Sequence, residues 1–223
     1  MVRENTIYRN KLSDHVEDYI RGQVEKGLLR PGDRVNEKEV CQTLGLSRTP
    51  VREALIQLNS EGIVEMLPHR AIRIKRHSLK DIRDLYMIIS ALEAAAAEVA
   101  INKFTAEDIA VQEKLYEQMK LAHKRNDFAR YKALNDRSHS LLVGKAGNKI
   151  LEELLAKLKK RFFDFPLILS GVPEWLNVML SDHGMLIELL KTKDKVGIRK
   201  LITEHWSYER NISFENEGKE LSS

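Results

Sequence analysis

The chain has 223 residues, of which 43% are hydrophobic and 31% charged, and its formal net charge is +4. This length allows one large domain or two modest ones, with enough apolar residues for a hydrophobic core. No window approaches the roughly 18 consecutive apolar residues of a membrane-spanning helix, and the N-terminus lacks the apolar core of a signal peptide. These features exclude a membrane protein and predict a cytoplasmic one. The charge alone is too small to imply a nucleic-acid partner, so the motifs must decide.

A first helix is predicted from Leu12 to Gly27, after a loose arm over residues 1–9. Apolar side chains recur at helical spacing through this segment, and Ser13 is placed to cap its N-terminus. The sequence Pro31-Gly32-Asp33 then predicts a turn.

A helix-turn-helix is predicted between residues 37 and 62. Residues 37–44 carry apolar side chains at helical spacing, and Gly45-Leu46-Ser47 is typical of a tight turn. Ser47 can cap the second helix, and Gly62 suits the left-handed conformation that ends it. One face of this second helix is apolar and is expected to be buried: Val51, Ala54, Leu55 and Leu58.

Two arginines lie on the other face of the second helix. Arg48 and Arg52 are four residues apart, so their side chains share one face near the helix N-terminus. Two guanidinium groups there suit phosphate or guanine contacts, as a recognition helix requires. Two short β-like runs follow, residues 63–67 and 72–75, around Pro68-His69-Arg70-Ala71. They predict a hairpin with a basic tip, that is, a wing.

The blocks Arg30-Pro31-Gly32-Asp33-Arg34-Val35-Asn36-Glu37, Leu46 to Leu55 and Glu61-Gly62-Ile63-Val64 together resemble the winged-helix domain of GntR-type bacterial transcription regulators. The resemblance covers residues 10–76. It implies that Arg34, Arg48 and Arg52 contact DNA, that Thr49 touches a phosphate, and that the wing enters the minor groove. Ala71 stands where the family usually has a wing-tip glycine. His69 or Arg70 is therefore expected to make the groove contact.

From Ser78 onward no further β-like pair is apparent, and six helices with short connections are predicted. They begin near Ser78, Thr105, Asp127, Asn148, Pro173 and Asp194, and the fourth is expected to continue to Phe165. Residues 78–214 are thus expected to form an all-α bundle. The fold class is mostly α, with a small β-hairpin in the N-terminal domain. The second domain resembles the FCD effector domain found beside such winged helices.

Four polar residues of the bundle suggest a metal site. Asn135 and His139 are four residues apart on one helix face, and His183 and His205 lie on two later helices. If they converge, one divalent ion such as zinc, nickel, copper, iron or manganese would suit three imidazoles and an oxygen. Spacing alone leaves a second interpretation open, because a helical histidine is more often a surface or core residue.

The FCD resemblance implies the metal interpretation. Metal-binding FCD domains show Asp-x-x-Phe-His and two later histidines, and the first block here reads Asn135-Asp136-Arg137-Ser138-His139. Asn135 thus replaces the usual carboxylate, which predicts a weaker hold on the ion and a more positive site. Asp136 points about 100° away around the helix and is not expected to substitute.

The same resemblance implies a homodimer that senses an organic acid. Many FCD domains carry an effector-binding arginine at the position of Ile89, so a ligand carboxylate is expected to use the metal or another cation such as Arg161. Arg161 also fits a plain solvated run, Lys159-Lys160-Arg161. Trp206, beside His205, could wall the effector pocket or serve only in packing.

The sequence therefore predicts a transcription regulator that binds a palindromic double-stranded DNA operator as a homodimer, with affinity controlled by an effector near the metal. Two alternatives remain open. The bundle could serve dimerisation alone, with structural histidines. The three histidines could also belong to a metal-dependent hydrolase or isomerase. Because no Glu or Asp is evidently placed as a general base beside them, a non-enzyme is expected.

Overall fold

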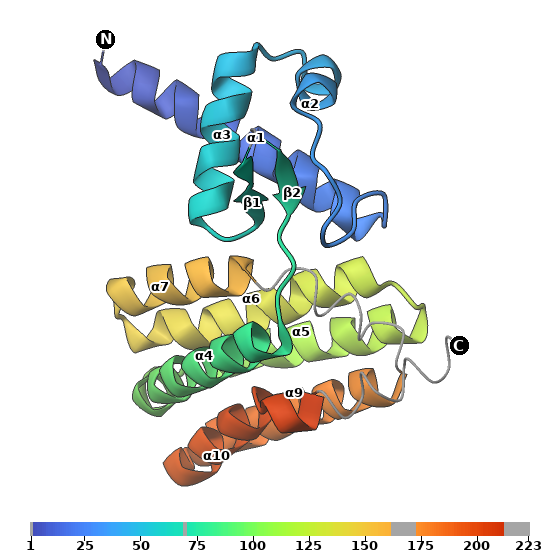
Figure 1. The fold of residues 1–223 in the computed structure, drawn as a ribbon. Helices are drawn as coiled ribbons and strands as arrows, with labels where there is room; N and C mark the ends of the chain where they lie inside the picture. Colours follow the sequence, from blue (N-terminus) through green and yellow to red (C-terminus); the bar gives the residue numbers. More distant parts are fainter. Residues whose placement is uncertain (1, 69–70, 162–172, 212–223) are drawn as a thin grey trace. The chain divides into compact units, whose positions relative to one another are not determined.

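A computed structural model describes residues 2–68, 71–161 and 173–211. The described residues divide into two compact units, one of residues 2–79 with 160–161 and one of residues 80–159 with 173–211. Each unit is described by itself. Helices dominate both, and the described residues contain one two-stranded antiparallel sheet, in the N-terminal unit (Figure 1). The predicted fold class is confirmed.

The N-terminal unit is a winged helix. Its elements are α1 (Val2–Glu25), α2 (Glu37–Leu44), α3 (Arg48–Ser60), β1 (Val64–Met66) and β2 (Ile72–Ile74). The two strands pair with Val64 opposite Ile74 and Met66 opposite Ile72. Figure 1 shows α1 crossing α3, with the hairpin beside them. The side chains that fill this core are almost fully buried: Val16, Ile20, Val51, Leu55, Leu58, Ile63 and Ile74.

Two expectations about helix starts in this unit were wrong. The predicted loose arm is helical from Val2, so Ser13 lies inside α1 and not at its N-terminus. No glycine or proline occurs before Gly22, so nothing in the sequence interrupts the backbone hydrogen bonds of a helix that is already formed. Ser47 does occupy the N-cap position of α3 with an extended backbone, but its hydroxyl makes no capping hydrogen bond.

The left-handed conformation predicted for Gly62 is confirmed, and Gly45, predicted only to lie in a tight turn, adopts the same conformation. Gly45 ends α2 with φ +64° and Gly62 follows α3 with φ +77°, both in the left-handed region that a side chain disfavours. The backbone N–H groups of Gly45 and Gly62 donate to carbonyls of the helices that they end. These two positions let the chain reverse direction before α3 and before the β1–β2 hairpin.

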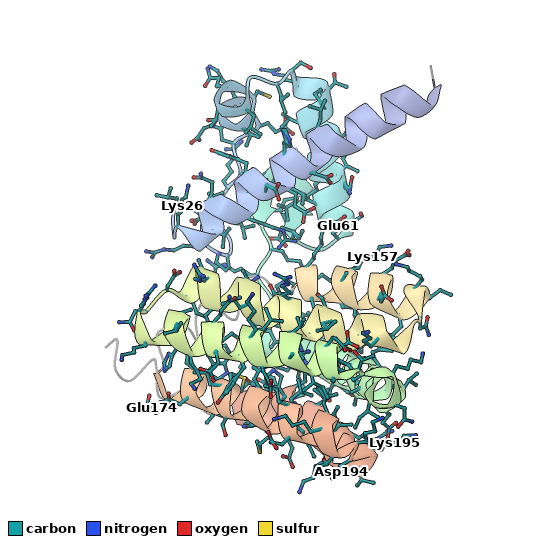
Figure 2. All side chains as sticks on the ribbon, turned by 180° about the vertical axis from the view of Figure 1, so that it is seen from behind. Lys26, Glu61, Lys157, Glu174, Asp194 and Lys195 are labelled. Atoms are coloured by element: carbon teal, nitrogen blue, oxygen red, sulfur yellow. The ribbon has the colours of Figure 1, made fainter. Side chains whose placement is uncertain are left out.

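The second unit contains six α-helices among its described residues, with a short 3₁₀ turn, η2 (Ile101–Lys103), after the first. They are α4 (Leu79–Ala100), α5 (Ala106–Lys124), α6 (Phe128–Ala146), α7 (Lys149–Lys160), α9 (Pro173–Thr192) and α10 (Lys195–His205). Thr105 and Asp108 form a capping box at α5, and Asp127, Asn148 and Asp194 accept from the first turns of later helices. Asp194 and Lys195 mark the turn between α9 and α10 in Figure 2.

One helix is shorter than expected. The helix predicted to reach Phe165 ends at Lys160 as α7, and Phe162, Phe163 and Phe165 lie outside the described residues.

The bundle core positions the candidate site. α5 packs against α6 and α9, and α9 packs against α10, as Figure 1 also shows. Ile89 is fully buried in the core, so the place where many FCD domains carry an arginine is apolar in this chain. Glu93 lies one turn further along the same buried face of α4. No helix among the described residues is long and apolar enough to cross a membrane.

Candidate functional site

The three histidines expected to converge do so in the middle of the bundle. His139 comes from α6, His183 from α9 and His205 from α10, and all three are buried. One ring nitrogen from each lies within 4.8 Å of the others. Histidines on three separate helices meet here because the three helices pack around one point.

Two of the imidazoles are backed by carboxylates. The Nδ1 atom of His139 contacts Glu93 Oε1, and His205 Nδ1 lies 2.9 Å from Asp182 Oδ2. An ionised carboxylate can only accept, so both Nδ1 atoms carry a proton, and in the neutral form of each ring the lone pair is on Nε2. The Nε2 atom of His139 is buried without a hydrogen-bond partner among the described residues. This arrangement is the one found around metal-ligating histidines.

Each backing carboxylate is itself paired with a cation. Lys159 Nζ lies 2.5 Å from Glu93 Oε2, and Arg210 donates two hydrogen bonds to Asp182, at 2.9 and 3.0 Å. Burial opposes ionisation of Glu93, but His139 and Lys159 outweigh it and hold the pKa of this carboxyl below its usual range. Burial likewise opposes ionisation of Asp182, where His205 and Arg210 keep the pKa low.

Burial has the opposite consequence for the imidazoles. It lowers the pKa of His139, although the Glu93 carboxylate pulls that pKa upward. It lowers the pKa of His183 further, since the neighbouring His139 and His205 also disfavour a positive charge there. Both rings are therefore neutral near pH 7, the state in which an imidazole can donate a lone pair to a metal.

Asn135 joins the histidines. It is half-buried on α6, one turn before His139, and its Oδ1 lies 2.8 Å from Nε2 of His183. Asp136 is exposed and pairs with Lys132 at 2.9 Å, away from the histidines, as its place around the helix predicts. All four residues predicted as ligands thus lie close together, and their role remains a prediction.

A small cavity opens at the histidines. It offers about 10 Å³ to a water-sized sphere, enough for a single water or ion. The residues that line it are His139, Asp182, His183, Leu186, Leu201, Ile202 and His205. Trp206 lies just behind this lining, with its ring centroid 5.7 Å from those of His139 and His205. Arg161 follows the end of α7 and is not among the described lining residues.

The predicted DNA-binding residues of α3 lie opposite its buried face. Arg48 and Thr49 are exposed in the first turn. Arg52 is half-buried, and its Nη1 atom donates to Glu37 Oε1 on α2 at 3.0 Å, a contact that the sequence did not reveal. Arg34 is exposed, and its backbone bridges to Arg73 of β2. His69 and Arg70 lie outside the described residues.

Sequence reasoning missed the residues that support the histidines, and two of them left a signal. Glu93 and Asp182 are carboxylates inside otherwise apolar buried helix faces. A charged residue at such a position needs a partner, so each could have been flagged. Ser138 and Gln112, also buried, left no comparable signal, because neutral polar residues are common on helix faces.

Comparison with known proteins agrees with this architecture. The model of bacterial regulatory proteins of the gntR family matches residues 12–74, and the FCD domain model matches residues 84–208. The HTH-type transcriptional regulator McbR of Escherichia coli is 27% identical over 195 residues, 86% of this chain and 88% of McbR. A solved structure of E. coli McbR/YncC superposes with a TM-score of 0.78, covering 92% of this chain and 97% of that chain.

A second relative has a higher identity. The probable D-xylose utilization operon transcriptional repressor of Paenarthrobacter nicotinovorans is 32% identical over 200 residues, 88% of this chain and 86% of that protein. The chain therefore belongs to the GntR family of bacterial transcription regulators, in the group that carries an FCD domain. Regulators of this family bind DNA, and FCD domains bind small-molecule effectors.

Proposed function

We propose that this protein is a homodimeric transcription regulator whose affinity for a palindromic operator is set by a small organic acid, bound at a divalent ion in the bundle. The main evidence for a bound ion is the set of three buried imidazoles, two of which donate from Nδ1 to a carboxylate. The unpartnered Nε2 atom of His139 fits a metal ligand.

The ion would be held by His139, His183 and His205, with Asn135 as the fourth ligand. Such donors suit zinc, nickel or a similar divalent metal. When bound, the ion would act as a Lewis acid that holds an anionic oxygen of the effector. The protein residues keep three neutral nitrogens and an amide oxygen within reach of one point.

Charge supports an anionic effector. Glu93 is already paired with Lys159, and Asp182 with Arg210. With an amide at position 135, no further carboxylate among the described residues lines the cavity to offset a divalent ion. An organic acid would supply that charge.

The small size of the cavity supports a rearrangement of the bundle when the effector binds. The cavity has room for an ion or a water, so an organic acid requires the lining side chains to move. A ligand that binds one arrangement of the bundle better than the other shifts the population between them. This unequal affinity would transmit effector binding to the DNA-binding unit.

For DNA, α3 would enter the major groove as the recognition helix. Arg48 and Arg52 would contact base edges or phosphates there. Arg34 and Thr49, both exposed, would hold phosphates, and His69 or Arg70 of the wing would reach the minor groove. Two such helices in a dimer would read half-sites about one helical turn apart.

An apolar face of α4 supports the homodimer. Met87, Ile88 and Val99 are 66%, 41% and 52% exposed, and Ala91 and Ala95 lie between them on the same side of the helix. Exposed apolar residues that gather on one helix face are typical of a protein interface. The small alanines would let the same helix of a second copy approach closely.

Elemental analysis of the purified protein, with mass spectrometry of co-purifying acids, tests the metal and effector together. We expect about one divalent metal per chain, removed by a chelator and lost in His139→Ala and His183→Ala. Operator affinity, measured by fluorescence anisotropy, should change when the acid is added to the metal-loaded protein. The proposal would fail if the purified protein contained no metal and could not be loaded with one, and if the histidine variants bound the operator as the wild type does. The alternative in which the bundle only dimerises would then stand.

Catalysis is the other alternative. The carboxylates beside the histidines, Glu93 and Asp182, are engaged by His139, Lys159, His205 and Arg210. A general base must be free to accept a proton from substrate. We therefore expect no turnover of candidate acids by metal-loaded protein, and product formation would overturn this assignment.

A further inference from the structure

The third imidazole, His183, is backed by a hydroxyl instead of a carboxylate. Ser138 Oγ on α6 lies 3.4 Å from His183 Nδ1 and 2.6 Å from Oε1 of Gln112 on α5. Ser138 and Gln112 are almost fully buried. A hydroxyl can either donate to or accept from a neutral imidazole, so its own proton decides which ring nitrogen of His183 is protonated.

The orientation of Gln112 determines where that proton lies. Its Nε2 atom donates to the backbone oxygen of Ser138 at 3.0 Å, which places Oε1 toward the Ser138 hydroxyl. An amide oxygen can only accept, so the single hydroxyl proton of Ser138 is donated to Gln112. The side of Ser138 Oγ that faces His183 is then a lone pair, and only a protonated Nδ1 is attracted to it.

On the other side of the ring, Nε2 of His183 lies 2.8 Å from Oδ1 of Asn135. The opposite tautomer would donate from Nε2 to this oxygen, so the two sides of the ring compete. Among the described residues, Asn135 has no second hydrogen bond that holds its amide. Its amide can therefore turn by 180° and present its nitrogen. Gln112 cannot turn without losing its bond to the Ser138 backbone, so Asn135 is the partner that adapts.

We propose that Gln112 and Ser138 are positioning residues that hold metal-free His183 in the Nδ1–H tautomer. In their neutral forms all three imidazoles then have Nε2 free of a proton, two because a carboxylate accepts from Nδ1 and one because the Ser138 hydroxyl does. Gln112 and Ser138 are neutral, so they add no negative charge to the site. Its consequence for metal binding rests on the proposed function, whereas the tautomer itself is a property of the metal-free protein.

The first test is NMR of chelator-treated wild-type protein labelled with ¹⁵N-histidine. Long-range ¹H–¹⁵N correlations distinguish the two neutral tautomers, and the spectrum of His183→Gln assigns the His183 signals. We expect the Nδ1–H pattern at pH 7.5. The Nε2–H pattern in the wild-type protein would overturn the proposal. This measurement stands whether or not the protein binds a metal.

The second test compares two variants of Gln112. Gln112→Leu removes the acceptor and frees the Ser138 hydroxyl to donate to His183 Nδ1, so His183 should change to the Nε2–H tautomer. Cobalt(II) affinity, measured by calorimetry and by the visible absorption of the bound ion, should fall roughly 10–100-fold.

Gln112→Glu is the matched control, since a carboxyl kept protonated by burial can donate to the Ser138 backbone oxygen and accept from the Ser138 hydroxyl. It should retain the wild-type tautomer and cobalt(II) affinity. A Gln112→Leu protein that folds, as judged by circular dichroism, yet keeps the wild-type tautomer would overturn the proposal. If this variant does not fold, the wild-type spectrum decides. A wild-type protein with the Nδ1–H tautomer but no metal affinity would refute the proposed function and leave the positioning role intact.

Discussion

Nη1 of Arg52 lies 3.0 Å from Oε1 of Glu37, which joins α3 to α2 across the helix-turn-helix. Both side chains are partly exposed, so the pair contributes about 0–1 kcal/mol to stability. Its main consequence is orientation. Glu37 engages Nη1 of Arg52, and under the proposed function the other N–H donors of the guanidinium would contact DNA.

Arg52→Ala should weaken specific operator binding by about 1–3 kcal/mol if the guanidinium makes a bidentate base contact. The loss should be smaller on non-specific DNA, because phosphate contacts dominate there. Fluorescence anisotropy with operator and scrambled duplexes at one salt concentration measures both. Glu37→Gln, which keeps the arginine, is the control and should retain specific binding. Unchanged affinity and footprint in Arg52→Ala would remove Arg52 from the readout.

Asn135→Asp should tighten metal binding. The change restores a carboxylate beside His183 Nε2, and an anionic oxygen attracts a divalent ion more strongly than an amide oxygen does. Competition with a chromophoric chelator measures the affinity. Asp136→Asn changes the neighbouring exposed carboxylate, which pairs with Lys132, and should have no effect. Weaker metal binding in Asn135→Asp would mean that Asn135 is not a ligand.

Glu93→Gln should lower metal affinity roughly 10–100-fold, since the carboxylate that backs His139 is lost. It should also destabilise the bundle, because Lys159 loses its buried partner. Asp84→Asn is the matched control: Asp84 lies on α4 and pairs with Lys80 at the surface. Chelator competition and urea unfolding separate the two effects. Equal metal affinities for the two variants would show that Glu93 does not support the site.

The metal-free protein should lose stability as the pH falls below about 6.5. Burial lowers the pKa of His139 and His183 in the folded state, while the unfolded chain titrates near 6.5. Below that pH the unfolded chain binds protons that the folded protein excludes, so unfolding becomes more favourable. Each unit of pKa lowering contributes about 1.4 kcal/mol.

Urea unfolding of chelator-treated protein between pH 7.5 and 5.5 measures this dependence. His183→Gln should show a shallower dependence than wild type, because one group that titrates only in the unfolded chain is gone. Glu93 and Asp182, whose pKa values are lowered, add a separate loss of stability at more acid pH, below about 4.5. Identical slopes for wild type and His183→Gln between pH 7.5 and 5.5 would contradict the burial argument.

Ala91→Arg should dissociate the dimer. The change places a long charged side chain in the middle of the apolar face of α4 and is compatible with the monomer fold, because Ala91 is exposed. Sedimentation velocity at micromolar concentration should show a monomer for this variant and a dimer for wild type. Val196→Arg alters another exposed apolar residue, on α10, and should remain a dimer. A dimeric Ala91→Arg would place the interface elsewhere.

The sequence alone was sufficient to determine the element order, the family and the histidine set. Apolar spacing marks the buried face of α3, Gly45 lies in the predicted turn, and Gly62 adopts the predicted left-handed conformation. These are local properties, decided by neighbouring residues along one helix or turn. The start of α1 was misjudged because the prediction relied on such local signals, and no local signal marks where a helix without glycine or proline must begin.

Only the tertiary structure showed what surrounds the histidines. Glu93, Ser138 and Asp182 reach the three imidazoles from three helices, and the pairing of Arg52 with Glu37 likewise spans two elements. Partners distant in sequence are selected by packing, which periodicity along a single segment does not encode. Periodicity places a residue on a buried face, and the neighbouring helix decides which partner it meets there.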